Sequence, residues 1–534
     1  MFDRIVKGYG AALSWVLAHP ALMLVVTLLT IGVNIYLYIV VPKGFFPEQD
    51  TGRLTGQIQA AQDISFQSMR QKLTQSVNII MSDPAVDTVG AFTGGSGSTT
   101  NTGRMFIALK PLDERKVTAG EVIARLRKKL SQEVGATTFL RPVQDINVGG
   151  RTANATYQFN LQGDNLDDLA KWSPLLLERM KAIPQITDLS IDRQDRGLEA
   201  LLTIDRDTAA RLGVSTRLID ETLYDAFGQR PVSTMYRQLN QYHVIMEVAP
   251  QYWQSPDTLS DIYVRSTNSE QVPLSAFTKF ERSTTTLAVN HQGQFPAVTI
   301  SFNLAPGVSL GDAVQQIEAA KRDIGLPATI QAGFQGTAQA YQQSIANTPI
   351  LVLAALATVY IVLGVLYESF VHPLTILSTL PSAGVGAILA LLLCRSELTV
   401  IALIGIILLI GIVKKNAIMM IDFALEAERT EGKNPRDAIF EACLLRFRPI
   451  MMTTMAALLG GLPLALGLGT GSELRRPLGI AIVGGLLVSQ MLTLFTTPVI
   501  YLYLDRLRLW IKPVRQIRYP RRVARELRDS ESGD

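Results

Sequence analysis

Six long apolar runs, almost free of charged residues, dominate the pattern of hydrophobic and polar positions along the chain. They cover residues 20–41, 349–366, 374–394, 398–424, 449–469 and 479–504. As helices they are long enough, or nearly so, to cross roughly 30 Å of hydrocarbon. The first run is longer than the core of a secretory signal, and no small-residue cleavage site follows it. The pattern therefore predicts a membrane protein with six spans and excludes a soluble protein.

The polar stretch between the first two runs, residues 42–348, is about 300 residues long, which is enough for two or three globular domains. Residues 157–161 alternate apolar and polar as a half-buried strand does, and LEALLTIDRD, VPLSAF and AVTISFNL are further predicted strands. Ser215 is a good N-cap for a helix ending at Gly228, and residues 310–325 form an amphipathic helix. The predicted fold class is an α-helical membrane bundle of six spans plus α+β subdomains of the ferredoxin-like, split βαβ type.

The distribution of Lys and Arg orients the spans by the positive-inside rule. Basic residues gather at the N-terminal flank, in the loop after the fourth span and in the tail: Arg4, Lys7, Arg429, Lys433, Arg436, Arg506, Arg508, Lys512, Arg515, Arg518, Arg521, Arg522, Arg525 and Arg528. The opposite side has only Arg395, Arg475 and Arg476 in its short loops. We therefore expect cytoplasmic termini, a basic cytoplasmic tail near anionic lipid, and residues 42–348 on the periplasmic or extracellular side.

Composition narrows the chemistry further. Net charge is +4 and the basic excess sits in the tail, so nothing points to nucleic acid as a partner. Neither the cysteines nor the histidines have the spacing of a disulfide framework or a metal site: Cys394, Cys443, His19, His243, His291 and His372. A GxxxxGK[ST] loop is also missing, so ATP is not the expected energy source. A transporter driven by an ion gradient, or a non-catalytic membrane assembly, fits better than an enzyme, and we expect no cofactor.

The fourth apolar run contains charges where charges are costly. Lys415 lies 17 residues beyond Leu398, so roughly 25 Å of helix separates it from that end. A lysine at that depth costs about 2.5–3.5 kcal/mol, so we expect it to face the bundle and to be paired. Asp422 lies seven residues further on and shares its helix face. The alternative for either Lys414 or Lys415 is a side chain that snorkels to the cytoplasmic interface.

The fifth run begins with RFRPIMMTT, in which Arg446 and Thr453 are again seven residues apart and on one face. Arg448 fits an ordinary basic flank at the cytoplasmic side. Thr453 lies inside the apolar run, and its hydroxyl either serves the site or bonds back to its own helix.

Four segments match a known family in both wording and order: PKGFFPEQDTG (42–52), LYESFVHPLTILSTLPSAGVGA (366–387), GIVKKNAIMMIDFA (411–424) and RFRPIMMTT (446–454). They resemble the C-terminal half of a resistance–nodulation–division (RND) exporter. AFGQRPVSTMY and NHQGQFPAVTISFNL resemble the Mdt-type (MdtB/MdtC-like) multidrug subfamily, nearer the B-type subunit. The resemblance covers about residues 1–510 and does not reach the tail.

The resemblance implies a domain plan, a location and partners. The plan has six parts: the cytoplasmic N-terminus and first span at 1–42, a first porter subdomain at 43–140, a second porter subdomain at 150–196 plus 293–340, a docking subdomain inserted in it at 200–290, five spans at 349–504, and the basic tail at 505–534. Such pumps lie in the bacterial inner membrane and export amphiphilic, drug-like small molecules by proton influx. They form homo- or hetero-trimers with a sister RND subunit, and they join a periplasmic adaptor protein and an outer-membrane channel.

The resemblance also implies a proton relay. Lys415 matches the family's essential lysine, and Arg446 and Thr453 match its arginine and threonine; Asn416 follows the lysine directly. In the family this lysine pairs with two aspartates of the fourth span, and proton binding to them releases it. The fourth span belongs to an N-terminal half that this sequence does not include. Asp422 is the only acid inside the apolar runs and does not match that pair. We therefore expect an N-terminal half as a partner.

A drug pocket is implied in the same way. Phe106 matches a pocket phenylalanine, the trio Tyr157, Phe159 and Leu161 matches apolar residues of the proximal pocket, and Phe92 lies near another pocket position. The alternative for each aromatic residue is a place in a subdomain core. The loop GGSGSTTNTG (94–103) overlaps the family's switch loop and lacks its phenylalanines.

Three other functions compete with half of a proton-driven multidrug exporter. A relative that handles lipid is disfavoured by the close match of the motifs. A metal exporter would need methionines converging in the porter cleft, and no convincing set is apparent. A non-pumping structural fragment or assembly subunit stays open, because the aspartate pair is missing from this chain.

Overall fold

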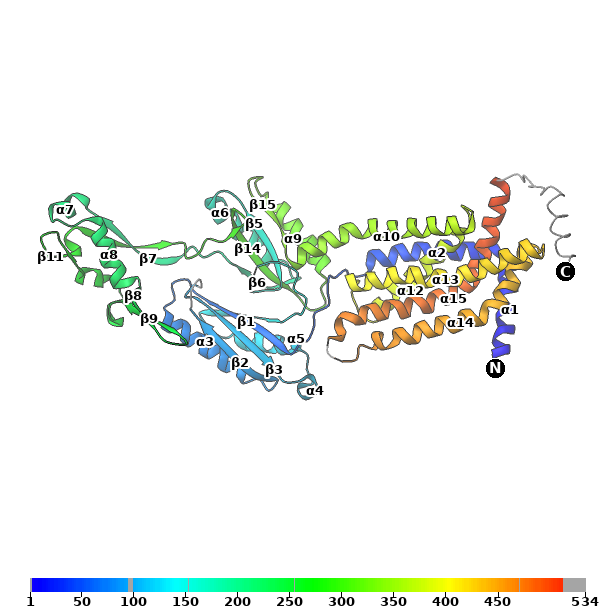
Figure 1. Ribbon diagram of the computed structural model, residues 1–534, viewed down its shortest axis with the longest axis horizontal. Helices are drawn as coiled ribbons and strands as arrows, with labels where there is room; N and C mark the ends of the chain where they lie inside the picture. Colours follow the sequence, from blue (N-terminus) through cyan, green and yellow to red (C-terminus); the bar gives the residue numbers. More distant parts are fainter. Residues whose placement is uncertain (1, 95–98, 152, 254, 470, 512–534) are drawn as a thin grey trace.

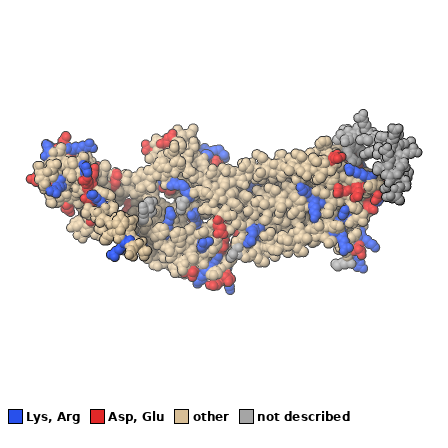
Figure 2. Space-filling view, viewed as in Figure 1, with Lys and Arg blue, Asp and Glu red and all other residues tan. Residues whose placement is uncertain are grey.

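The computed structural model describes residues 2–94, 99–151, 153–253, 255–469 and 471–511. The molecule is elongated, with a helical bundle at one end, two sheet-containing units in the middle and a third unit at the other end (Figure 1). The start of the N-terminal helix lies at the far end of the bundle. Charged side chains are sparse on the middle of the bundle and frequent on the three units (Figure 2).

Six helices within the described residues are long and apolar enough to cross a membrane, as the sequence predicted. They are α2 (Pro20–Val40), α10 (Thr337–Tyr367), α11 with α12 (His372–Leu377 and Leu380–Leu393), α13 (Val400–Thr430), α14 (Pro435–Leu466) and α15 (Ser472–Ile511). The last helix continues past Asp505, so the expected start of the tail falls inside it. Residues 512–534 of that tail lie outside the described part.

A further helix, α1 (Phe2–Ala18), precedes the first span and was not predicted. Its apolar side is buried against the bundle, and the ring of Tyr9 stacks on Phe447 with 4.6 Å between centroids. The Tyr9 hydroxyl donates to the carbonyl of Leu494 on α15 at 2.9 Å. The helix is therefore anchored to the bundle by packing and by one hydrogen bond.

Helix α15 packs in the centre of the bundle against α12, α13 and α14. Small residues permit the close approach. A Cβ added at Gly386 of α12 would lie 2.5 Å from the carbonyl oxygen of Gly484, so a larger side chain would separate these helices.

The first sheet unit contains four antiparallel strands in the order β2-β3-β1-β4. Along the chain its elements are β1 (Arg53–Ala60), α3 (Phe66–Met81), β2 (Val86–Thr93), β3 (Thr102–Leu109), α4 (Leu112–Arg115), α5 (Ala119–Leu130) and β4 (Ala136–Pro142). Thr118 and Glu121 form a capping box at the start of α5. One face of the sheet packs on α3 and α5 through Leu54, Ile58 and Met105. The other face stays open.

The second sheet unit is interrupted in sequence. Its elements are β5 (Tyr157–Gln162), α6 (Leu166–Lys181), β6 (Ile186–Ile191), β13 (His291–Gln292), β14 (Phe295–Leu304), α9 (Leu310–Ile324) and β15 (Gln331–Gln335). Strand β14 pairs with β5 on one edge and with β6 and β13 on the other, and β15 pairs with β5. The chain passes from β15 through Gly336 directly into the spanning helix α10.

Strand β5 corrects one prediction. The alternating pattern predicted a half-buried strand, but all five residues from Tyr157 to Leu161 are buried. The polar side is covered because the segment before the strand folds back over it. The Gln158 amide accepts from the backbone N–H of Arg151 at 3.1 Å and donates to its carbonyl at 2.5 Å.

The third unit is inserted between β6 and β13. It contains β7 (Gly197–Ile204) paired with β12 (Thr278–Thr285), the helices α7 (Arg206–Arg211) and α8 (Thr216–Phe227), the hairpin β8 (Arg230–Tyr236) and β9 (Gln241–Met246), and the short strands β10 (Tyr263–Arg265) and β11 (Gln271–Pro273). The prediction for α8 is confirmed, with Ser215 as its cap. The predicted strand VPLSAF is wrong beyond Pro273, because Leu274–Ala276 turns into a 3₁₀ helix that buries Leu274.

Candidate functional site

Helix α13 has one face that the other described residues leave uncovered. Ile404 and Leu408 are 51% and 49% exposed on it, and Lys415 and Asp422 are exposed further along. Lys415 forms no ion pair with any residue that the structure describes. Among the described residues, Lys415 therefore neither faces the bundle nor is paired, and its pairing with aspartates of an N-terminal half stays a prediction. Its position along the helix nevertheless places an ammonium group amid apolar side chains.

The next residue, Asn416, points into the bundle and is 6% exposed. Its amide nitrogen donates to the Thr454 hydroxyl at 3.2 Å and to the Gln490 side-chain oxygen at 3.0 Å. The Thr454 hydroxyl donates to the same oxygen at 2.9 Å. We call these three residues the amide clamp. Since they come from α13, α14 and α15, the clamp fixes the rotation of α13, and with it the direction in which Lys415 points.

The other two predicted relay residues, Arg446 and Thr453, take no part in the hydrogen bonds of the clamp. The Arg446 guanidinium lies over the ring of Phe423, 4.2 Å from its centroid, and its buried Nε has no hydrogen-bond partner among the described residues. The Thr453 hydroxyl donates to the carbonyl of Ile450 in its own helix at 3.2 Å. Thr453 thus takes the alternative geometry, and the residue beside it, Thr454, makes the contact between helices.

Sequence reasoning missed Thr454 and Gln490. Gln490 lies within the apolar run 479–504, where an uncharged amide is not costly enough to interrupt the run. A side-chain amide in a spanning segment needs a hydrogen-bond partner on a neighbouring helix. The presence of Gln490 in an apolar run could therefore have predicted a contact between helices at this position.

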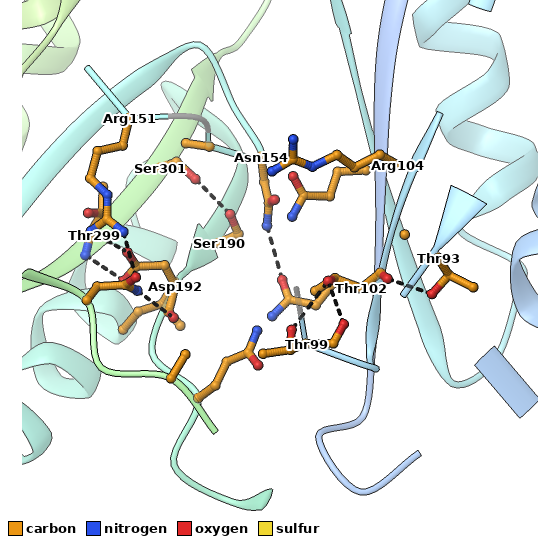
Figure 3. Close-up of a pocket in the computed structure, with 18 of the residues that line it drawn as sticks. Thr93, Thr99, Thr102, Arg104, Arg151, Asn154, Ser190, Asp192, Thr299 and Ser301 are labelled. Carbon is orange, nitrogen blue, oxygen red and sulfur yellow. Dashed lines mark hydrogen bonds and ion pairs between the residues drawn. The ribbon is translucent and has the colours of Figure 1, made fainter. Parts of the chain in front are cut away.

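The open face of the first sheet forms one wall of a second candidate site. Phe92 and Phe106 are 51% and 56% exposed there, and their rings stack with 6.3 Å between centroids. Between this wall and the second sheet unit lies a cavity of about 220 Å³, which we call the intersheet cleft (Figure 3). Phe92 lines this cleft, and Phe106 lines an adjoining hollow of about 110 Å³.

The opposite wall of the intersheet cleft is polar. The Asp192 carboxylate accepts from the backbone N–H of Thr299 at 2.7 Å and lies 3.7 Å from the Arg151 guanidinium. Burial raises the pKa of Asp192, although that N–H and Arg151 oppose the shift. The hydroxyls of Ser190 and Ser301 are hydrogen-bonded at 2.8 Å. Figure 3 shows this wall facing Arg104 of the first sheet.

The structure does not bring the predicted trio to the intersheet cleft. Phe159 and Leu161 are fully buried in the core of the second unit, where Phe159 packs edge-on against Phe334. Tyr157 is 8% exposed and borders a separate cavity of about 140 Å³. Four residues of the loop 94–103 line the cleft, namely Gly94, Thr99, Thr102 and Gly103, while residues 95–98 lie outside the described part.

The chain is similar to known proteins in both sequence and fold. A profile of the AcrB/AcrD/AcrF family matches residues 1–505. Multidrug resistance protein MdtC of Yersinia enterocolitica is 57% identical over 504 residues, which are 94% of this chain and 49% of that protein. MdtC of Yersinia pestis is 58% identical over 504 residues, again 94% of this chain and 49% of that protein. The chain is similar in fold to the crystal structure of a heavy metal efflux pump, with a TM-score of 0.85 at 20% sequence identity. The match covers 95% of this chain and 53% of the pump's chain.

These matches fix the family and leave finer points as predictions. The chain spans about half the length of the curated relatives it matches. Both relatives are C-type subunits (MdtC), and their identities do not say whether this chain is more similar to the C-type or to the B-type. Closeness to the B-type therefore remains a prediction. The family consists of transporters, and six apolar helices agree with an inner-membrane protein. The chain belongs to the AcrB/AcrD/AcrF family of RND transporters.

Proposed function

We propose that this chain supplies the lysine-bearing half of a proton-driven exporter of amphiphilic drugs. The observation that carries the proposal is the exposure of Lys415 midway along a spanning helix, on a face that no other helix within the described residues covers. An ammonium group in contact with hydrocarbon is costly, so this face needs a partner that provides negative charge. The matched relatives are about twice as long, which leaves room for such a half.

The chemistry of the relay follows from electrostatics in a low-dielectric setting. Carboxylates of the partner half would stay ionised while the Lys415 ammonium lies beside them. When a proton neutralises a carboxylate, the attraction is lost and the ammonium is free to move. The amide clamp keeps Asn416 in place during this exchange, because its hydrogen bonds involve no ionisable group. Helix α13 can then move as a unit with α14 and α15.

The link from the membrane to the sheet units is covalent and hydrogen-bonded. Helix α10 continues from β15 of the second unit, so motion of the helix moves the sheet. At the same level, the N–H of Leu398 donates to the carbonyl of Pro42 at 2.8 Å, and the N–H of Val400 donates to that of Phe45 at 3.1 Å. These contacts hold the linker after α2 against the start of α13. A shift of α13 would thus change the intersheet cleft.

We assign the units by the same proposal. The first and second sheet units serve as porter subdomains near 43–140 and near 150–196 plus 293–340, and the inserted unit near 200–290 serves for docking. Along the chain, the four main strands of each sheet alternate with helices as strand, helix, strand, strand, helix, strand. In the sheet, two strands that are joined by a helix are separated by one other strand. This arrangement supports the split βαβ type. The exposed tip between β8 and β9, with Leu239 94% exposed, supports a docking role toward a sister subunit, an adaptor or an outer-membrane channel.

The test co-expresses this chain with an N-terminal half that carries two membrane-embedded aspartates, in a host without its own pumps. Lys415→Ala should abolish drug resistance, while Lys414→Ala, the matched control on the adjacent half-buried position, should retain most of it. Immunoblots must show equal amounts of each variant in the membrane. Resistance that survives Lys415→Ala would refute the relay and leave a structural subunit as the better account.

A further inference from the structure

A cavity of about 1340 Å³, which we call the junction cavity, lies where the first sheet unit meets the bundle. One wall is the segment from the end of β3 to α4, with Lys110 and Asp113. The other wall is the loop after α12 and the start of α15, with Arg395 and Arg476. Figure 1 shows α4 on the side of this unit nearest the bundle, and Figure 2 shows charged side chains of both signs in this region. Because spanning helices begin and end here, the cavity lies at the membrane surface.

The charged residues that line the junction cavity fall into two groups. Two ion pairs satisfy each other: Arg115 with Asp50 at 2.5 Å, and Arg53 with Asp145 at 4.0 Å. The side chains of the others form neither an ion pair nor a hydrogen bond with any residue that the structure describes, and these are Lys110, Arg395, Arg476, Glu48, Asp113 and Glu473. Positive and negative groups are equal in number in this second group. A zwitterionic ligand would therefore balance the site, whereas a simple anion would not.

Arg395 is held in an unusual backbone conformation. Its φ is 51°, in the left-handed region. The N–H groups of Arg395 and Ser396 donate to the carbonyls of Leu392 and Leu391 at 3.1 and 2.9 Å. This is the Schellman geometry at the end of a helix, in which the left-handed position is usually glycine. An arginine there places a guanidinium at the cavity at a cost to the backbone, and such strain occurs preferentially at functional sites.

The second arginine and a nearby acid are set by the ends of α14 and α15. A Cβ added at Gly467, the cap of α14, would lie 3.1 Å from Cδ of Arg476, so the aliphatic part of that arginine lies directly against the end of α14. Three residues before Arg476, the Oε2 atom of Glu473 is buried and has no hydrogen-bond partner among the described residues. A buried carboxylate oxygen needs a donor. The cavity thus combines two guanidinium groups with a carboxylate that lacks a donor.

We propose that the junction cavity binds the headgroup of an ethanolamine phospholipid from the leaflet on the side of the sheet units. The phosphate oxygens bind Arg395 and Arg476, because the planar guanidinium fork matches phosphate geometry. The primary ammonium of the headgroup donates to Glu473. The acyl chains begin beside Leu393 and Leu466, which are exposed at the ends of α12 and α14. Basic pockets beside spanning helices bind phospholipid headgroups in the same way.

The chemistry of the site distinguishes this headgroup from other phospholipid headgroups. A choline headgroup carries the same charges but has no N–H to donate to the buried oxygen of Glu473. A glycerol headgroup provides the phosphate without a cation, so the charges of the site would stay unbalanced. Since Lys110 lines the same cavity from the first unit, the bound lipid would join that unit to the bundle. The inference is separate from the proposed export, because it involves neither Lys415 nor the intersheet cleft.

Native mass spectrometry of the purified 534-residue chain in detergent tests the site. Dioleoyl lipids with ethanolamine, choline or glycerol headgroups are added one at a time, and the Kd of the first bound lipid is measured. The ethanolamine lipid should bind about fivefold or more tightly than the choline lipid, because one charge-assisted hydrogen bond separates them. The double variant Arg395→Gln with Arg476→Gln should raise the Kd of the ethanolamine lipid about tenfold. Arg476→Gln alone leaves the end of α12 intact and should raise that Kd about threefold or more.

Two further variants separate the headgroup contacts. Glu473→Gln should abolish the preference for ethanolamine over choline and change the Kd of the choline lipid less than about twofold. Arg475→Gln, at the adjacent exposed position that is not among the residues lining the cavity, is the matched control and should change neither Kd. Thermal melts followed by circular dichroism check that each variant is folded.

Several outcomes overturn the inference. Equal Kd values for all variants would show that the lipid binds only to the general apolar surface of the bundle. Tighter binding of the glycerol lipid would refute the zwitterionic match. Glycerophosphoethanolamine carries the headgroup without acyl chains, and binding of this soluble compound as tight as that of the lipid would mean that the site takes a free phosphodiester. None of these measurements involves drug export, so selective lipid binding without resistance would refute the proposed function alone.

Discussion

Breaking the amide clamp should destabilise the bundle by a predictable amount. Gln490→Leu removes the oxygen that accepts from Asn416 at 3.0 Å and from Thr454 at 2.9 Å, while side-chain volume stays similar. A hydrogen bond between membrane helices contributes about 0.6 kcal/mol on average and up to about 1.7 kcal/mol. Two such bonds are lost and one buried amide is left partly unsatisfied, so we expect a loss of about 1–3 kcal/mol in the free energy of unfolding.

The assay is unfolding of the purified chain in mixed micelles by added sodium dodecyl sulfate, followed by circular dichroism. Thr496→Val is the matched control on the same helix: Thr496 is 5% exposed, but its hydroxyl donates only to the carbonyl of Leu492 in α15, at 3.0 Å. Its loss should stay below about 0.5 kcal/mol, because no contact between helices is removed.

A double-mutant cycle isolates the contact itself. Asn416→Ala and Gln490→Ala should show a coupling energy of about 0.5–1.7 kcal/mol, since either change alone already breaks their shared bond. If the two losses simply add, or if Gln490→Leu is no more destabilising than Thr496→Val, the clamp does not hold the three helices together.

Two further predictions concern the sheet units and their junction with the membrane. Phe159→Ala should destabilise the protein by about 3–5 kcal/mol because Phe159 is fully buried. Phe106 is half-exposed, so Phe106→Ala should cost less than about 1 kcal/mol of stability and mainly weaken ligand binding. Thermal melts and ligand titrations separate the two effects, and equal losses of stability would contradict this prediction. Burial, with the nearby carboxylates of Asp312 and Glu48, raises the pKa of Glu397 to about 7 from an ordinary 4.5. The folded state therefore holds this proton more tightly, and the stabilisation, at most about 3 kcal/mol, is present at low pH and lost as pH rises toward 7. Melting curves between about pH 5 and pH 8 should show a smaller decline for Glu397→Gln than for the native chain, and parallel declines would exclude Glu397 as the cause.

The spans were predictable because hydrocarbon imposes a length and a composition that the sequence displays directly. Helix α8 was predictable because Ser215 and Gly228 mark its ends. The burial of β5 was not, because its polar face is covered by the preceding segment through Gln158, and a local pattern cannot show what a loop folds onto. For the same reason the sequence did not show that Phe159 lies in the core of the second unit and not in the predicted pocket.

Lys415 shows why the candidate site could be predicted only in part. Insertion cost indicates that a lysine midway along a span needs a partner, but it does not say whether that partner comes from the same chain. Only the rotation of α13 decides this point. That rotation is set by uncharged groups, Asn416 and its partners Thr454 and Gln490, whose contacts join residues far apart in sequence. Once Asn416 is directed inward, the side chain of the preceding residue, Lys415, points about 100° away from it around the helix, on the side opposite to the buried Ala417. The outward direction of Lys415 is thus a consequence of the clamp. Under the proposed function, the uncovered face of α13 is where a second half would supply acidic groups.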